Sequence, residues 1–451
     1  MQISNSLKKF ICQRNTALSQ ALKMIDANVK GFLIVLDGDV VVGVLTDGDI
    51  RRYLINNSNL TNLQVKDAFN SKFVYASLDD PQEKIISLFN SKIKFLPIID
   101  ERRRLINIQF SHEIKFQKSS KVIRTRAPAR ITFGGGGSDK FNFFENQRGL
   151  CINAAIQKFA FCSLLSNQNN RFIKIESSDF NEVWEFDSVE SLYESDDPRL
   201  LIYKKIASFV NLTESVTIRT NCDFPIGSGL GGSSALSVAL LHAFSILRGN
   251  RLSKINLAKQ AYKFERIAMA VNGGWQDQYV AALGGVNAIH FSKDKHHVHN
   301  INLSHEVLSE LQASLYLCYS GKSHDSSAIH HSIDLSTGGR ISQMKETVRL
   351  AEEMLTMLTD GELQHFDRNM NKNWQLKKQY SHEIADGSLL ERLNFLRSSG
   401  ASSAKILGAG GGGYFLVRVP FENERKFRSC CAEKDFVPER VLFDMDGVKS
   451  W

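Results

Sequence analysis

Short apolar runs in the first hundred residues predict a helix followed by two strands. TALSQALKMID (16–26) has apolar residues at helical spacing. FLIVLDGDVVVGVL (32–45) predicts two strands around the turn Asp37-Gly38-Asp39. TDGDIRRYL (46–54) then begins another helix.

A second set of elements follows in the same order. PQEKIISLFN (81–90) has helical spacing, and FLPIID (95–100) and LINIQF (105–110) predict strands. Matching GVLTDGD (43–49) to NIQFSHE (107–113) gives an internal offset of 64 residues, from 43 to 107. The pattern therefore predicts a duplicated unit over residues 1–118.

The pattern changes at SSKVIRTRAPARITF (119–133), where VIRTR predicts a strand that Pro128 breaks or bends. Further on, SSALSVALLHAFSILR (233–248) predicts a buried helix that Gly249-Asn250 ends. INLAKQAYKFERIAM (255–269) predicts another helix. This region is therefore expected to contain both helices and strands.

Three glycine-rich loops interrupt this second region: FGGGGSDK (133–140), PIGSGLGGSSA (225–235) and GAGGGGY (408–414). The middle loop precedes the helix over 233–248, so its free N–H groups favour an anion such as phosphate. Pro225 precedes the first glycine, and no acidic residue follows before Phe264, which excludes a dinucleotide-binding loop. No lysine follows Gly232, which excludes a Walker loop.

Composition is that of a folded protein of two to four domains, with 451 residues, 43% hydrophobic and 23% charged. We expect a cytoplasmic protein without a membrane partner, because no apolar run approaches the roughly 18 residues that span a bilayer. The first residues also lack the apolar core of a signal peptide. The seven cysteines form no C-x-x-C pair, so we expect core residues rather than disulfides or zinc ligands.

The net charge of +8 comes from dispersed basic residues, which favours small phosphorylated substrates over nucleic acid. The densest block, ERRR (101–104), is interpreted as a solvated turn. KDKHHVHN (293–300) lacks the helical spacing of metal-binding histidines and is expected to be a surface loop.

Residues 1–118 resemble a pair of cystathionine-beta-synthase (CBS) repeats, about 1–58 and 59–118. The resemblance implies that Thr46 and Asp49 hold the ribose and phosphate of a regulatory nucleotide, and that the chain forms a homodimer. Phe110 and Glu113 take these places in the second copy. A scaffold without a ligand is the alternative.

APARITFGGGGSD (127–139), PIGSGLGGSSA (225–235) and AKILGAGGGGY (404–414) resemble the three motifs of the GHMP kinases, in the same order. The resemblance covers about residues 122–451. It implies a two-lobed α+β kinase fold, with a ribosomal-protein-S5-like N-terminal lobe over 122–300 and a ferredoxin-like C-terminal lobe over 301–451. It also implies ATP as phosphate donor and Mg²⁺ as cofactor.

Site residues carried over from this family fall into four groups. Asp277 is the implied catalytic base, and Arg130 orients it or stabilises charge on the transferred phosphate. The implied magnesium ligands are Ser234 and Glu265. Residues expected to cradle the triphosphate are Pro225, Gly227, Ser228, Gly229, Leu230, Gly231, Gly232, Ser233 and Ser234. Residues expected to contact the acceptor sugar are Gly135, Gly136, Ser138, Asp139, Gly410, Gly411, Gly412, Lys322 and His324, with Lys377 and Lys378 as further candidates for a distal phosphate.

One branch is most similar. FERIAMAVNGGWQDQYVAALGGVNAIHF (264–291), YSGKSHDSS (319–327) and NWQLKK (373–378) resemble segments of D-glycero-D-manno-heptose 7-phosphate kinases, which phosphorylate an anomeric hydroxyl. Ser320 and His324 depart from that branch, where threonine and arginine stand. The first hypothesis is therefore a heptose 7-phosphate kinase that serves surface-polysaccharide synthesis. A kinase for an unphosphorylated sugar, such as fucose, galactose or another heptose, and a non-catalytic nucleotide sensor remain as alternatives.

Overall fold

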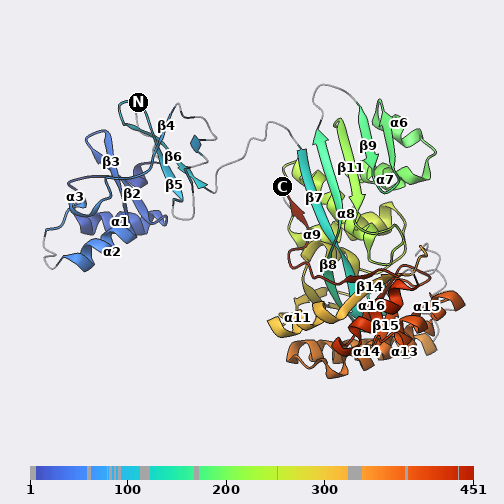
Figure 1. Cartoon of the computed structure of the whole chain (residues 1–451). Helices are drawn as coiled ribbons and strands as arrows, with labels where there is room; N and C mark the ends of the chain where they lie inside the picture. Colours follow the sequence, from blue (N-terminus) through green and yellow to red (C-terminus); the bar gives the residue numbers. More distant parts are fainter. Residues whose placement is uncertain are drawn as a thin grey trace. The chain divides into compact units, whose positions relative to one another are not determined.

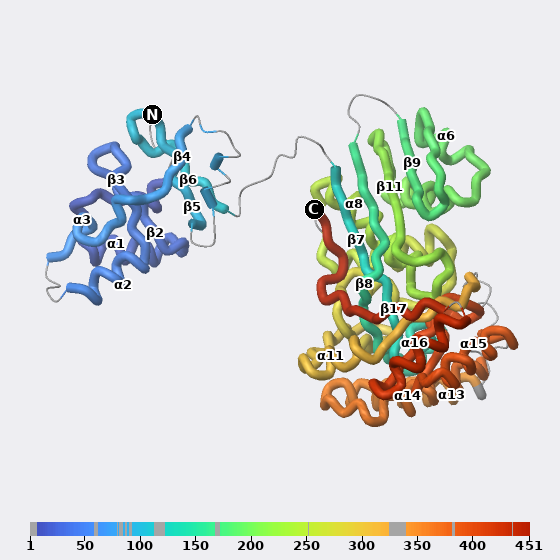
Figure 2. The backbone as a smooth tube through the Cα atoms, viewed as in Figure 1, coloured from blue at the N-terminus to red at the C-terminus, as the bar shows by residue number. Residues whose placement is uncertain are grey.

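The computed structural model describes residues 7–57, 62–78, 80, 84–85, 88–89, 93–111, 122–166, 172–250, 252–323, 338–380, 384–434 and 436–451 (Figure 1). The chain divides into two compact units, Met1–Lys118 and Ser119–Trp451. The backbone trace of each unit can be followed in Figure 2. No helix in these ranges is both long and apolar enough to span a bilayer.

The first unit contains two three-stranded sheets with the same strand order, β1-β2-β3 and β4-β5-β6. In each sheet the first pair is parallel and the second antiparallel, and a bulge falls at the same place, after Val35 in β2 and after Ile98 in β5. These are the features of a duplicated unit. The elements are η1 (Lys8–Phe10), β1 (Ile11–Gln13), α1 (Leu18–Asn28), β2 (Phe32–Asp37), β3 (Val40–Thr46), α2 (Asp47–Asn56), α3 (Val65–Ala68), β4 (Ala76–Ser77), β5 (Phe95–Ile99) and β6 (Leu105–Phe110). The helix expected over 81–90 includes residues outside the described ranges.

Aromatic rings join the two halves of this unit. Phe32 of β2 stacks on Phe95 of β5, with ring centroids 3.5 Å apart. Phe110, at the end of β6, lies 6.0 Å from Phe32 and 5.9 Å from Phe10 between ring centroids. The two repeats therefore share one apolar core, to which each contributes rings.

The second unit begins with an eight-stranded sheet built around β8 (Gly149–Ser166). β7 (Val122–Gly134) pairs along one edge of β8, while β11 and β12 share the other edge. The register shifts between Pro128 and Ala129, so the proline bends β7 at a bulge without ending it. The other strands are β9 (Ile173–Ser177), β10 (Glu182–Phe186), β11 (Val216–Cys222), β12 (Val286–Phe291), β13 (His296–Asn300) and β18 (Lys449–Ser450).

Helix α8 (Gly232–Leu247) packs on β7 and β8, and it confirms the buried helix expected over 233–248 (Figure 1). The helix expected over 255–269 is divided in the structure. Its first part is α9 (Lys254–Lys263), and a π-helical segment, η4, follows over Phe264–Ala268. The remaining helices of this lobe are α5 (Phe141–Phe144), α6 (Val189–Glu194), η3 (Pro198–Leu200), α7 (Leu201–Phe209) and α10 (Gln276–Leu283).

The C-terminal part of this unit has a four-stranded antiparallel sheet in the order β15-β16-β14-β17. Numbered along the chain, this is 2-3-1-4, the order of a ferredoxin-like sheet, so the expected fold class is confirmed. Helices gather around this sheet (Figure 1). The elements are α11 (His305–Ser314), β14 (Leu315–Tyr319), α13 (Gly338–Asp360), η5 (Leu363–His365), α14 (Phe366–Lys378), α15 (Gly387–Ser398), β15 (Ser403–Ile406), β16 (Tyr414–Arg418), η7 (Phe421–Asn423), α16 (Glu424–Ala432) and β17 (Pro438–Arg440).

The histidine-rich segment 293–300 is not the surface loop that was expected. His296–Asn300 forms β13, which pairs with β12 at the edge of the sheet. The His296 ring packs edge-on against Trp275, with centroids 4.4 Å apart. Burial lowers the pKa of His296 to about 4, so this histidine is neutral at pH 7 and serves as an aromatic packing group.

The end of helix α10 depends on a close backbone contact. A Cβ at Gly284 (φ +73°) would lie 2.1 Å from the amide nitrogen of Gly447. Gly249 has a similar φ of +70°, with nothing within 4 Å of a Cβ. We predict that Gly249→Ala lowers the free energy of unfolding by about 1–2 kcal/mol through backbone strain alone. Gly284→Ala should cost about 3 kcal/mol or more, because strain and overpacking add.

Urea unfolding of both variants, followed by circular dichroism, checks the difference. Equal losses in the two variants would contradict the role given to the Gly284–Gly447 contact.

Candidate active site

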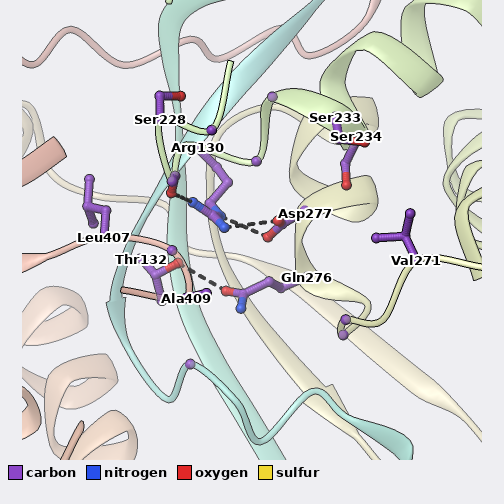
Figure 3. Close-up of a pocket in the computed structure, with 18 of the residues that line it drawn as sticks. Arg130, Thr132, Ser228, Ser233, Ser234, Val271, Gln276, Asp277, Leu407 and Ala409 are labelled. Atoms are coloured by element: carbon purple, nitrogen blue, oxygen red, sulfur yellow. Dashed lines mark hydrogen bonds and ion pairs between the residues drawn. The ribbon is translucent and has the colours of Figure 1, made fainter. Parts of the chain in front are cut away.

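The three glycine-rich loops line one cavity of about 730 Å³ in the second unit (Figure 3). Eight of the nine residues expected to cradle a triphosphate line it: Pro225, Gly227, Ser228, Gly229, Gly231, Gly232, Ser233 and Ser234. Gly135, Gly136 and Asp139 of the first loop also line it, as do Arg130, Glu265 and Asp277. The fold therefore brings together residues that lie far apart in the sequence.

Arg130 on β7 holds Asp277 through a bidentate ion pair. Its Nε donates to Asp277 Oδ1 at 2.8 Å and its Nη2 to Oδ2 at 2.9 Å, while its Nη1 donates to the Gly229 carbonyl. Arg130 is buried, and Asp277 lies in the first turn of α10 (Figure 3). Two parallel hydrogen bonds hold the guanidinium and the carboxylate in one plane, so the carboxylate has one orientation in the cavity.

Glu265 is a buried carboxylate of the cavity; hydroxyl and amide groups donate to it, and the Arg266 guanidinium lies 3.8 Å away. The hydroxyls of Ser233, Ser234 and Ser237 donate to it at 3.0, 2.8 and 3.2 Å. The side-chain amide of Gln278 donates both to Glu265 and to the Ser234 hydroxyl. The π-helical turn η4 places Glu265 beside the first turn of α8.

These oxygens fit a magnesium ion. Ser234 and Glu265 both line the cavity and are within hydrogen-bond distance of each other, and magnesium prefers such hard oxygen ligands while keeping several waters. In the described ranges, no three His, Cys, Asp or Glu side chains are grouped as metal ligands.

Asp139, in the first glycine-rich loop, is almost fully buried. Its carboxylate accepts from the main-chain N–H groups of Gln276 at 3.1 Å and Gly137 at 3.2 Å. Burial, followed by the nearby charge of Asp277, raises the pKa of Asp139. A Cβ at Gly274 would come within 1.8 Å of the Asp139 carboxylate, so this approach requires glycine.

The structure places two of the expected site residues outside the cavity lining. The Ser138 side chain is fully buried, and its hydroxyl bonds to the Gly135 and Leu150 backbones, so it supports the loop rather than facing the cavity. Leu230 packs in the core, and its carbonyl accepts from the Arg130 N–H.

The third loop and Lys322 also differ from expectation. The third loop lines the cavity with Gly408 and Ala409, and Gly410, Gly411 and Gly412 are not among the lining residues. A Cβ on Gly410 would meet Ile384, and the Gly411 N–H donates to the Ile384 carbonyl. Lys322 is exposed, pairs with Asp386 at 2.8 Å and is not among the residues that line the cavity. His324 lies outside the described residues.

The second and third loops touch each other directly. A Cβ on Gly408 (φ +63°) would lie 2.6 Å from the Cα of Gly229, and a Cβ on Gly229 would lie 3.0 Å from the Leu407 carbonyl oxygen. Glycine at both positions therefore permits the two loops to meet.

Three lysines line the cavity, namely Lys140 of the first loop and, near Arg130, Lys377 and Lys405. Lys377 of α14 donates to the carbonyls of Ile406, at 3.1 Å, and Gly408. Lys405 of β15 is 7% exposed and donates to the Phe133 carbonyl at 2.8 Å. Burial, and then neighbouring cations, lowers the pKa of both Lys377 and Lys405 to about 7. Lys378, the neighbouring candidate, is not among the lining residues.

Thr46 and Asp49 of the first unit form a capping box at the start of α2. The Thr46 hydroxyl donates to Asp49 Oδ2 at 2.6 Å and accepts from the Asp49 N–H at 3.2 Å. The other oxygen of Asp49 pairs with Arg52 at 2.6 Å. Both residues therefore already stabilise the helix end.

Sequence reasoning missed three residues of the site, Gln276, Gln278 and Lys405. Gln276 and Gln278 flank Asp277 in the motif that located the base, yet only the aspartate received a role. Gln276 bonds to Thr132 at 3.0 Å, and Gln278 donates to the magnesium candidates. Lys405 is the second residue of the third motif, AKILGAGGGGY, and a charged residue among apolar ones was the available sign of a functional role.

Comparisons with known proteins agree with this architecture. The family model described as GHMP kinases N terminal domain matches residues 200–285, and the CBS domain model matches residues 7–56. The D-glycero-alpha-D-manno-heptose 7-phosphate kinase of Campylobacter jejuni is 32% identical over 341 residues, covering 73% of this chain and 99% of that protein. A mevalonate kinase of Pyrococcus horikoshii is 25% identical, covering 66% and 89% respectively.

Solved structures give the same picture. A putative sugar kinase from Campylobacter jejuni has a TM-score of 0.62 and 27% identity, covering 74% of this chain and 99% of its own. A structure described as a D-glycero-D-manno-heptose 1-phosphate kinase from Bacteroides thetaiotaomicron has a TM-score of 0.60 and 26% identity, covering 73% and 98%.

The lowered pKa values of Lys377 and Lys405 generate a prediction about pH. Their folded-state pKa of about 7 lies below the ordinary value of 10.5, so between these values the unfolded chain binds more protons. The free energy of unfolding should therefore rise with pH from 7 to 9, by up to about 1.4 kcal/mol per pH unit for each lysine. The variant Lys377→Met/Lys405→Met should lack this increase.

Urea unfolding at pH 7, 8 and 9 measures the effect, with Lys378→Met as the control that keeps the wild-type slope. Identical pH dependence in the wild type and the double variant would contradict the prediction.

Proposed function

The chain belongs to the GHMP kinase family and is an ATP-dependent sugar kinase, and we propose that its acceptor is the anomeric hydroxyl of D-glycero-D-manno-heptose 7-phosphate. The main support is the 32% identity to the Campylobacter jejuni enzyme over nearly all of that enzyme's length. The product would be the 1,7-bisphosphate, a precursor suited to making an activated sugar for surface polysaccharide.

The nucleotide would lie against the second loop and the start of α8. The N–H groups of the first turn of a helix lack intrahelical partners and carry the positive end of its dipole, which suits the triphosphate of ATP. Ser234 and Glu265 would hold Mg²⁺, which supplies charge neutralisation for the phosphates. Gln278 and Ser237 keep the Glu265 carboxylate in place for this role.

Asp277 would act as the base that accepts the proton of the sugar hydroxyl. Its bidentate pair with Arg130 fixes its direction, and the same guanidinium lies where it can stabilise charge on the transferred phosphate. Asp139, with Gly135 and Gly136, lies on the acceptor side, where carboxylate oxygens can accept hydrogen bonds from sugar hydroxyls.

A substrate panel tests the proposed acceptor. Purified protein with ATP, Mg²⁺ and the heptose 7-phosphate should release ADP and give the 1,7-bisphosphate, detected by phosphorus NMR. Galactose, fucose and unphosphorylated heptose should be turned over at a much lower kcat/KM. A higher kcat/KM for an unphosphorylated sugar would replace the proposed acceptor with that sugar.

Asp277→Asn provides the matched control, because it keeps the shape of the side chain and removes its basicity. We expect kcat to fall about 10²–10⁴-fold while binding of an ATP analogue persists. Near-normal turnover of Asp277→Asn would contradict the role of Asp277 as base.

We propose in addition that the first unit regulates the kinase and joins two chains into a homodimer. Thr46 and Asp49 would hold an adenine nucleotide, whereas Phe110 packs against Phe10 and Phe32 at the matching place of the second repeat. Exposed apolar side chains on the two helices, Leu54 and Ile55 of α2 and Leu22 of α1, offer a surface for a second copy.

Calorimetry with AMP tests the regulatory site, with the kinase site saturated by Mg²⁺ and a nonhydrolysable ATP analogue. We expect the wild type to bind AMP and Thr46→Val to lose this binding. Ser304→Ala removes another helix N-cap, at α11, and should bind AMP normally. Undiminished binding to Thr46→Val would place the nucleotide elsewhere.

A further inference from the structure

Lys377 and Lys405 are cations that the cavity encloses without a carboxylate partner in the described part of the chain. Their recorded hydrogen bonds go only to main-chain carbonyls, those of Ile406 and Gly408 for Lys377 and that of Phe133 for Lys405. A protonated lysine has three N–H donors, so one donor of Lys377 and two of Lys405 remain for another acceptor.

The carboxylates of the cavity are already engaged with other groups. Asp277 is paired with Arg130, and Asp139 accepts from main-chain N–H groups. Glu265 accepts from three serine hydroxyls and an amide. Enclosing unpaired cations is costly, and a second cation nearby adds repulsion. An anionic ligand in the cavity would offset both costs.

The position of the lysines favours the acceptor over the nucleotide. Lys405 bonds to the carbonyl of Phe133, the first residue of the first glycine-rich loop, which is expected to contact the acceptor. Lys377 follows Asn373, another lining residue, by one helical turn. Figure 3 shows Leu407 and Ala409, next to the Lys377 contacts, on one side of the Arg130–Asp277 pair and Ser233 and Ser234 on the other.

We propose that Lys377 and Lys405 together bind the phosphate group that the acceptor sugar already carries. This assignment rests on the proposed function, because it requires a phosphorylated acceptor. A phosphate offers several acceptor oxygens to the three remaining N–H donors, and its charge balances the two ammonium groups. The lysines would then distinguish a sugar phosphate from the unphosphorylated sugar.

Single variants Lys377→Met and Lys405→Met test the proposal in the full-length enzyme, and Lys378→Met is the matched control. Each cavity variant should raise the KM for the heptose 7-phosphate about 10- to 100-fold, the effect of losing a hydrogen bond to a charged group. The KM for ATP and the kcat should stay near the wild-type values. Methionine replaces the buried charge with an apolar group of similar length, which folded proteins tolerate.

A binding experiment distinguishes the phosphate of the acceptor sugar from the transferred phosphate of ATP as the group that Lys377 and Lys405 bind. With Mg²⁺ and a nonhydrolysable ATP analogue bound, the terminal-phosphate position is filled, and inorganic phosphate is titrated in a calorimeter. The wild type and Lys378→Met should bind it, and Lys377→Met/Lys405→Met should not. Weaker binding of the ATP analogue relative to ADP in the double variant, with unchanged phosphate binding, would assign the lysines to the transferred phosphate and overturn the proposal.

The same titration distinguishes failure of the inference from failure of the proposed acceptor. If the wild type does not phosphorylate the heptose 7-phosphate but binds inorganic phosphate through the two lysines, the acceptor is wrong and the phosphate site stands. If turnover occurs and the variants keep a normal KM and normal phosphate binding, the phosphate site is wrong and the acceptor stands.

Discussion

The bidentate pair between Arg130 and Asp277 is the interaction on which the cavity depends. It joins the central sheet to the first turn of α10, and the same guanidinium also bonds to the Gly229 carbonyl in the second loop. One arginine thus fixes both the carboxylate proposed as the base and the loop proposed to face the nucleotide. Because the pair is largely withdrawn from solvent, its geometry is held by both hydrogen bonds and charge.

Charge is divided between the two sides of this pair. On the side of α8, buried Glu265 accepts from hydroxyl and amide donors, with Arg266 at 3.8 Å, and its carboxylate suits a cation. On the side of the third loop, Lys377 and Lys405 suit an anion. A cation-binding side and an anion-binding side suit phosphoryl transfer, because catalysis of this reaction is mainly positioning and neutralisation of charge. The lobes supply the two kinds of site separately, and β7 connects them.

Much of this could be predicted from the sequence, because glycine loops and the long apolar helix have local signatures. The strand–turn–strand repeats and the helix over 233–248 follow from periodicity and turn residues. The direction of side chains could not be predicted in the same way. Ser138 belongs to a correctly located loop, yet its hydroxyl turns inward to bond with the backbone of Leu150 at the start of β8. Lys405 becomes enclosed only when the C-terminal sheet packs under Phe133.

The contact between Gly229 and Gly408 constrains how this enzyme can change over evolutionary time. When two side chains pack together, a larger residue at one position is often accommodated by a smaller residue at the other. Here both residues are already glycine, so neither can become smaller. No second-site change in the pair itself can rescue a substitution. Changes of acceptor specificity are therefore expected in the side chains that line the cavity around the Gly229–Gly408 contact, while the two glycines themselves stay fixed.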